Sequence, residues 1–306
     1  LRDGLLAHWL ERSAEGTYTY DVRLASSRDG GRTWESLGAL HTDRRPAEHG
    51  FVSWVDGASG ARAFWLDGRA TVDADHGEGD HAHGAGPMQL RTAHVSDSVR
   101  QEQLLDDAVC DCCPTATAMT DHGPLVAYRD RDPETETRDV AVVRWLGDRW
   151  SDPVHPHRDG WVIAGCPVNG PALTARGGEV ALAWFTMQPH PRLMGVRSFD
   201  GGASWEQATV LFESEGETRA HGRPALAFDT LGRLHVVALG EEGDASGWYH
   251  LIVGSEGSVE ERRLVVPSGT SRSVGMPSLI ALDGGELLLA TTVLDGDLTR
   301  VRVVEL

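Results

Sequence analysis

Ser27-Arg28-Asp29-Gly30-Gly31-Arg32-Thr33-Trp34 recurs far downstream as Ser198-Phe199-Asp200-Gly201-Gly202-Ala203-Ser204-Trp205. In each octet the aspartate can accept backbone N–H bonds within a tight turn, and the glycines allow positive φ angles. The tryptophan can pack between two sheets. The octet is therefore interpreted as a folding device between two strands, and Asp29 and Asp200 are expected to be structural.

The chain around the octets repeats one four-strand unit. A first strand follows Gly or Pro, a second follows a glycine turn, a third alternates, and a short fourth often begins with Trp. First strands are expected at 49–53, 113–117, 169–173, 223–227 and 276–280, and second strands at 4–9, 61–65, 123–128, 179–184, 233–238 and 286–291. Trp9, Trp65 and Trp184 end second strands and are expected in the core.

Second strands recur every roughly forty to sixty residues, a period typical of propeller blades. A two-sheet sandwich would not repeat the same strand order. The sequence therefore predicts an all-β, six-bladed β-propeller with four-stranded antiparallel blades, formed as a single domain by residues 1–306. The first blade lacks its innermost strand and the last its outermost, so roughly twenty further N-terminal residues are expected to complete the ring.

The composition of the chain narrows the range of expected binding partners. The net charge is −18, the hydrophobic fraction is 40% and the charged fraction 24%, with no apolar run long enough for a membrane span. Every basic residue is arginine, and no basic stripe is present. The sequence thus argues against nucleic acid and against a membrane span.

In a propeller, residues just before each first strand and just after each second strand form one rim of the central channel. All four cysteines fall there, with several histidines and with Met187 and Met276. Thiolate, imidazole and thioether ligands favour copper, with zinc as second choice. The candidate metal ligands are Cys110, Cys112, Cys113, Cys166, His49, His81, His83 and His221.

The candidate metal ligands also allow other interpretations. Four cysteines can form two disulfides in an exported protein, and Cys166 could bridge to Cys112 or Cys113. They can also be redox-active or inert thiols. His49 or His221 alone can be a hydrogen-bonded rim residue, and the loop with His81 and His83 can be a solvated tip.

The two octets resemble the Asp box of the sialidase-like superfamily of propellers. Segments 110–115 (Cys-Asp-Cys-Cys-Pro-Thr), 128–131 (Tyr-Arg-Asp-Arg) and 165–172 (Gly-Cys-Pro-Val-Asn-Gly-Pro-Ala) resemble bacterial proteins labelled exo-α-sialidase by repeat similarity. The resemblance implies that the octets lie opposite the ligand face. The fold alone does not define an activity.

Sialidases hold the substrate carboxylate with three arginines and use a Tyr–Glu nucleophile and an Asp acid–base group. The resemblance gives as candidates Asp67, Arg69, Tyr128, Arg129, Asp130, Arg131, Arg223 and Glu241. Against a sialidase, the family's Arg-Ile-Pro segment is absent, only Tyr128 of four tyrosines lies near the rim, and Cys and His occupy the sugar positions. The clusters 67–69 and 129–131 can equally be ion pairs that stiffen loops.

The working hypothesis is an exported protein, periplasmic or secreted although no signal is visible. It binds a soft metal at the channel mouth, with or without redox activity. The alternative is an exo-α-sialidase-type glycoside hydrolase or a glycan-binding propeller with its cysteines in disulfides. A third hypothesis is a protein-interaction platform with no convergent pocket chemistry.

Overall fold

The described residues of the chain form six antiparallel sheets. The computed structural model describes residues 4–57, 60–72, 86–295 and 298–306. The first three sheets contain β1 (Leu5–Arg12), β2 (Tyr20–Ser27) and β3 (Glu35–Ala39); β4 (His49–Gly57), β5 (Gly60–Asp67), β6 (Met88–Val95) and β7 (Val99–Val109); and β8 (Ala116–Thr120), β9 (Gly123–Arg129) and β10 (Val140–Arg144). A short 3-10 helix, η1 (Arg69–Val72), follows β5.

The last three sheets follow the same order. They contain β11 (Ala172–Arg176), β12 (Glu179–Thr186), β13 (Arg192–Ser198) and β14 (Thr209–Glu213); β15 (Thr218–Phe228), β16 (Leu234–Glu242), β17 (Ala245–Val253) and β18 (Val259–Pro267); and β19 (Ser278–Ala281), β20 (Leu287–Asp295) and β21 (Leu298–Glu305). In the described parts of the chain, no helix has the length and apolar character needed to cross a membrane.

Each sheet is a meander in which neighbours along the chain pair antiparallel, as the repeat predicted. Three of the six sheets have three strands rather than four. In the third sheet the fourth strand is reduced to isolated bridges, Val142 to Val154 and Trp145 to Trp150. Pro153 and Pro156 flank this segment, and proline cannot donate to a strand ladder.

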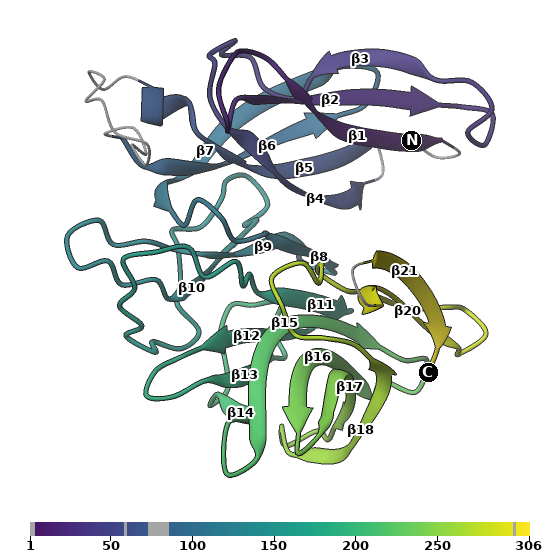
Figure 1. Cartoon of the computed structure of the whole chain (residues 1–306). Helices are drawn as coiled ribbons and strands as arrows, with labels where there is room; N and C mark the ends of the chain where they lie inside the picture. The colour runs from purple at the N-terminus through teal and green to yellow at the C-terminus, as the bar shows by residue number, and fades with distance from the viewer. Residues whose placement is uncertain (1–3, 58–59, 73–85, 296–297) are drawn as a thin grey trace.

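The predicted first strands lie against one another. β4 contacts β8, β8 contacts β11, β11 contacts β15 and β15 contacts β19, so five sheets are joined in chain order through these strands. Figure 1 shows the succession, from the purple first sheet through the teal and green sheets to the yellow sixth. Among the described strands no comparably extensive contact joins the sixth sheet to the first.

Tryptophans of the second strands show how the sheets are covered. Trp65 and Trp184 are fully buried, as expected, and pack within separate apolar clusters between sheets. Trp9 was expected in the core, but 44% of its surface is exposed. It lies on β1, an edge strand of the first sheet, and no described strand pairs with the outer edge of β1.

Both octets form the turn that their composition predicted. Asp29 accepts hydrogen bonds from the backbone N–H and hydroxyl of Thr33 at 2.8 and 2.7 Å, and Asp200 accepts the equivalent pair from Ser204. These bonds hold the pKa of both aspartates at about 2. Both carboxylates therefore accept hydrogen bonds within their own turns.

Candidate functional site

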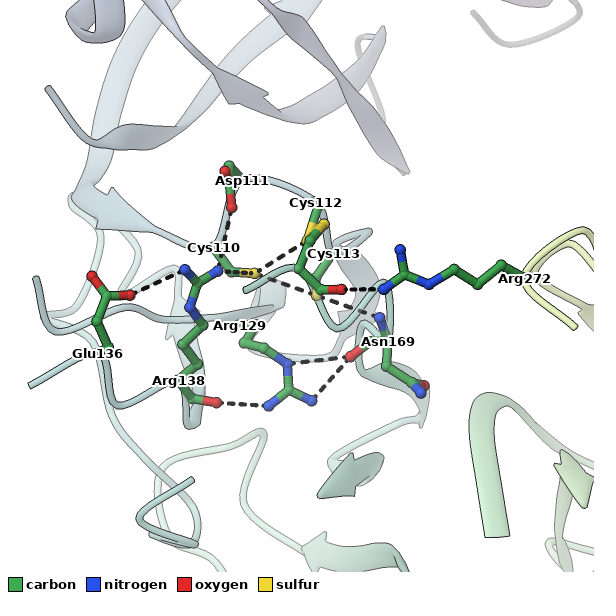
Figure 2. Close-up of a disulfide and its surroundings, with 10 residues drawn as sticks. Cys110, Asp111, Cys112, Cys113, Arg129, Glu136, Arg138, Asn169 and Arg272 are labelled. Atoms are coloured by element: carbon green, nitrogen blue, oxygen red, sulfur yellow. Dashed lines mark hydrogen bonds and ion pairs between the residues drawn. A yellow bond between two sulfur atoms is a disulfide. The ribbon is translucent and has the colours of Figure 1, made fainter. Parts of the chain in front are cut away.

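The four cysteines gather where the third sheet meets the fourth. Cys110 follows β7, Cys112 and Cys113 precede β8, and Cys166 precedes β11. Cys112 and Cys166 form a disulfide with 5.9 Å between their Cα atoms, whereas Cys110 and Cys113 are buried free thiols (Figure 2). The convergence expected from the sequence is present, with one bridge in place of four thiols or two disulfides.

Cys110 lies at the centre of this sulfur cluster. Its Sγ lies 3.4 Å from that of Cys113 and 3.8 Å from that of Cys112, and Arg138 donates to it at 3.2 Å. The hydrogen bond with Cys113, a backbone N–H and the Arg138 charge outweigh burial and lower the pKa of Cys110 to about 6. Burial, together with Cys110, raises the pKa of Cys113.

An arginine-rich cavity of about 360 Å³ lies beside the sulfur cluster, where the fourth, fifth and sixth sheets begin. Phe185 and Met187 form part of its apolar wall. Its polar lining comprises Asn169, Ser214, Arg219, His221, Arg223, Thr270 and Arg272. We call this space the arginine cavity.

Asn169 connects the cavity to its surroundings. Its Oδ1 accepts the Arg223 backbone N–H at 2.7 Å, and its Nδ2 donates to the His221 carbonyl at 3.0 Å. Its own N–H points at the sulfur of Cys113, 3.4 Å away. Arg223 has a φ of 53°, in the left-handed region, so these two hydrogen bonds fix an unusual backbone conformation at the cavity wall.

The charges of the arginine cavity favour an anion. Arg223 is 6% exposed, and its buried Nη1 has no hydrogen-bond partner among the described residues. Burial, with the nearby charge of Arg272, lowers the pKa of Arg223. Arg272 donates to the Cys166 carbonyl at 2.7 Å, as Figure 2 shows. A carboxylate could accept from both guanidinium groups.

One carboxylate, that of Glu241, contacts two residues that line the cavity. Glu241 lies 3.1 Å from Nε2 of His221 and accepts the Thr270 hydroxyl at 2.7 Å. The hydrogen bond from Thr270 lowers the pKa of Glu241. Glu241 is therefore an ionised partner of the His221 ring.

Two further sequence-predicted residues lie at a separate place with His49. Asp67 and Arg69 form a close ion pair at 2.7 Å, at the end of β5 and the start of η1. His49 is fully buried 3.7 Å from Asp67 and 3.3 Å from Asp43. Burial opposes its charge, but the hydrogen bond with Asp43 and the two carboxylate charges outweigh it and raise the pKa of His49. None of these residues lines the arginine cavity.

The remaining candidates form internal bonds. Tyr128 is buried with its hydroxyl on Asp106, and burial raises its pKa. The buried Arg129 guanidinium donates to three backbone carbonyls. Asp130 lies 3.3 Å from Nε2 of His155, and Arg131 lies 2.6 Å from Glu136. His81 and His83 lie outside the described residues.

The structure therefore brings Arg223 and His221 together at one cavity, with Glu241 behind His221, and brings the cysteines together beside it. Sequence reasoning missed Arg219 and Arg272, which complete the cation set, and Arg138, which faces the Cys110 thiolate. Arg272 lies four residues before the predicted first strand of the sixth repeat, at 276–280, and so outside the residues expected at the rim. Asn169 was counted as the start of a strand and not as a site residue.

No family model matches the chain, and no curated protein matches it. Solved structures do. An ulvan lyase, a polysaccharide lyase, is 10% identical over 100% of this chain and 78% of its own, with a TM-score of 0.62. The intramolecular trans-sialidase of Ruminococcus gnavus is 11% identical, over 99% and 92%, at 0.59. An α-L-arabinofuranosidase from Fusarium graminearum is 14% identical, over 99% and 89%, at 0.57.

At these identities the likeness concerns the fold alone. The chain has a sialidase-like fold, shared with enzymes that hydrolyse, transfer or cleave glycans. The fold is thereby defined, and an activity does not follow from the fold.

Proposed function

We propose that this protein binds a carboxylate-bearing glycan in the arginine cavity. The observation that carries the proposal is the buried Arg223 guanidinium, whose Nη1 is unpartnered in a cavity that Arg219 and Arg272 also line. An unpartnered donor on a buried cation costs free energy that a bound carboxylate recovers. The apolar wall of Phe185 and Met187 suits the face of a sugar ring.

The cavity favours binding over hydrolysis by the usual pair of carboxylates. Glycosidases of that kind place two carboxyl groups across the scissile bond. The described residues that line the cavity include no carboxylate, and Glu241 reaches it only through His221 and Thr270. Tyr128, the one candidate nucleophile of sialidase type, is bonded to Asp106 in the interior. We therefore place glycan binding first and sialidase-type hydrolysis second.

The fold-level part of the proposal is a single exported domain, residues 1–306, whose six sheets are the blades of one propeller and whose octets are Asp boxes. The repeated strand order and the successive contacts of the first strands support it. The disulfide supports an oxidising compartment, periplasmic or extracellular.

Calorimetric titration with sialic acid, glucuronic acid and a neutral sugar of similar size tests the binding site. We expect the acidic sugars to bind, and Arg223→Met to weaken their binding about tenfold or more, as loss of a charged hydrogen bond implies. Arg176→Met removes an exposed arginine paired with Glu179, and serves as the charge-matched control. Equal affinity for neutral and acidic sugars would contradict the proposal. Release of a fluorogenic sialoside, measured in parallel, separates hydrolysis from binding.

A second proposal concerns soft metal at the sulfur cluster. The Sγ atoms of Cys110, Cys112 and Cys113 all lie within 4.8 Å of one another. Reduction of the disulfide would free Cys112 and offer three thiolates to copper(I), or to zinc as second choice. His49 and His221 do not belong to this group of atoms. Anaerobic copper(I) titration should show one site only after reduction, and Cys113→Ser should abolish it. Uptake by the oxidised protein at the same affinity would count against the cluster.

A further inference from the structure

The sulfur cluster holds a free thiol in contact with a disulfide. The Sγ atom of Cys110 lies 3.8 Å from that of Cys112, which is bonded to Cys166. At this separation no other atom lies between the two sulfurs. A free thiol against a disulfide sulfur is the starting arrangement for thiol–disulfide exchange, in which a thiolate attacks one sulfur of the bridge. The contact therefore permits a reaction that needs neither a glycan nor a metal.

A second free thiol touches the first. The Sγ atom of Cys113 lies 3.4 Å from that of Cys110. The two residues are separated by Asp111 and Cys112, which is the C-x-x-C spacing of disulfide oxidoreductases. Cys110 thus has a possible disulfide partner on either side, and a bond that it forms with Cys112 can pass on to Cys113.

The guanidinium of Arg138 faces the sulfur of Cys110. Its Nη1 donates to Sγ at 3.2 Å, and Asp111 and Glu136 hold the same guanidinium at 3.3 and 3.1 Å (Figure 2). Arg138 is only 4% exposed, so water screens its charge weakly. The guanidinium therefore stabilises the negative charge that the sulfur of Cys110 must carry when it attacks.

The four cysteines run from the interior to the surface. Cys110 and Cys113 are each 1% exposed, whereas Cys112 is half-buried and Cys166 is exposed in the connection before β11. A reagent in solution meets Cys166 first and cannot reach the two buried thiols directly. Exchange with the bridge is the route by which those thiols can react with a molecule outside the protein.

We propose that the sulfur cluster is a thiol–disulfide exchange relay, which passes two electrons from the buried thiols of Cys110 and Cys113 to a small-molecule disulfide at Cys166. In the first step the Cys110 thiolate attacks the sulfur of Cys112. A Cys110–Cys112 bond forms, the Cys112–Cys166 bond breaks, and its electron pair leaves on Cys166. Cys113 then attacks Cys110, and the electron pair of the Cys110–Cys112 bond leaves on Cys112. Each attacking thiol gives up one proton and each released thiolate takes one, so these steps need no oxidant.

The last steps take place at the surface. The Cys166 thiolate attacks the external disulfide, forms a mixed disulfide and releases one external thiol. Cys112 then attacks the sulfur of Cys166, restores the original bridge and releases the second external thiol. In sum, the external disulfide is reduced to two thiols, and Cys110 and Cys113 are oxidised to one disulfide.

The first experiment locates the free thiols of the full chain. The protein, with its disulfide intact and a chelator present, is alkylated under native conditions and digested without reduction, and mass spectrometry maps the label. We expect label on Cys166 and a new disulfide that contains Cys110, because alkylation of the exposed thiol draws the exchange forward. Label confined to Cys110 and Cys113, with the original bridge retained, would overturn the proposal, as would the absence of label.

The second experiment uses dithiobis(nitrobenzoate), a small disulfide that releases a coloured thiol. The native chain should release two coloured thiols and retain no adduct, and Cys110→Ser should release no more than one and keep an adduct. Arg138→Met should slow the release about tenfold, as loss of one charged hydrogen bond implies. Arg131→Met is the matched control, because Arg131 pairs with the same Glu136 and no contact joins it to the sulfurs among the described residues.

The controls separate the relay from simple exposure of the buried thiols. Stable adducts on Cys110 and Cys113 of the native chain would refute the relay, because those thiols would then react without the bridge. Equal slowing by Arg138→Met and Arg131→Met would refute the role given to Arg138. The mapping of label on the native chain keeps the test valid if Cys110→Ser fails to fold.

Discussion

Arg129 gives the sharpest test of how the third and fourth sheets are joined. Its buried guanidinium donates to the carbonyls of Asn169, Arg138 and Phe185 at 2.7 to 3.2 Å and lies 4.9 Å from the Trp161 ring. The described residues offer it no carboxylate within 4.0 Å. Arg129→Met would keep much of the apolar contact and leave three carbonyls without donors.

Each buried carbonyl left without a donor costs about 1 to 3 kcal/mol. Removing an unpaired buried charge offsets part of that cost. We expect Arg129→Met to lower the free energy of unfolding by roughly 3 kcal/mol, near the low end of the range for three lost partners. Urea denaturation followed by fluorescence measures it. Arg131→Met, two residues away, breaks only the partly exposed pair with Glu136 and should cost under about 1 kcal/mol. Equal losses for the two variants would refute this account of Arg129.

Three further predictions concern other elements. Burial, with His235 and Arg263, lowers the pKa of His250 from 6.5 to about 4, so the free energy of unfolding should fall as pH drops from 6.5 towards 4. Urea titrations at several pH values measure this fall. A His250→Asn variant whose free energy of unfolding changes with pH as steeply as that of the native protein would contradict the prediction. Asp200 has a pKa of about 2 against 3.8, so Asp200→Asn should lower the Tm at pH 7 but not near pH 2, where calorimetry should find the two proteins alike. The Cys112–Cys166 bridge spans 54 residues, and replacing both cysteines by serine should lower the free energy of unfolding by about 4 kcal/mol. Adding a reductant to this double variant should not change its Tm.

The meander order of the sheets was predictable because each repeat carries its own signals. A turn glycine, an apolar run and a Trp recur in register, and each is a local property of the sequence. The sequence predicts a full fourth strand in the third sheet, because Trp150 indicates a strand there. In the structure, Pro153 and Pro156 limit the pairing of this strand. The exposure of Trp9 depends on which strand covers β1, which no local pattern encodes.

The strand ends that carry the candidate residues were predictable, but the orientation of their side chains was not. Tyr128 and Arg129 end β9 side by side, where side chains alternate between two faces, and both faces are buried between sheets. Arg129 therefore turns to backbone carbonyls, and Tyr128 to Asp106. Asp43, the partner of His49, was missed because it lies in the connection between β3 and β4, several residues before the predicted first strand at 49–53.

The disulfide links the two functions proposed for the sulfur cluster and the arginine cavity. Cys166 is bonded to Cys112, and its carbonyl accepts the Arg272 guanidinium that lines the cavity. While the bridge is intact, Cys112 has no thiolate to offer a metal, and the carbonyl that orients Arg272 is held to the third sheet. Reduction frees Cys112 and loosens that carbonyl at once. Taken together, the two proposals predict glycan binding by the oxidised protein and copper binding by the reduced one, so acidic-sugar affinity should fall in the conditions under which copper(I) affinity rises.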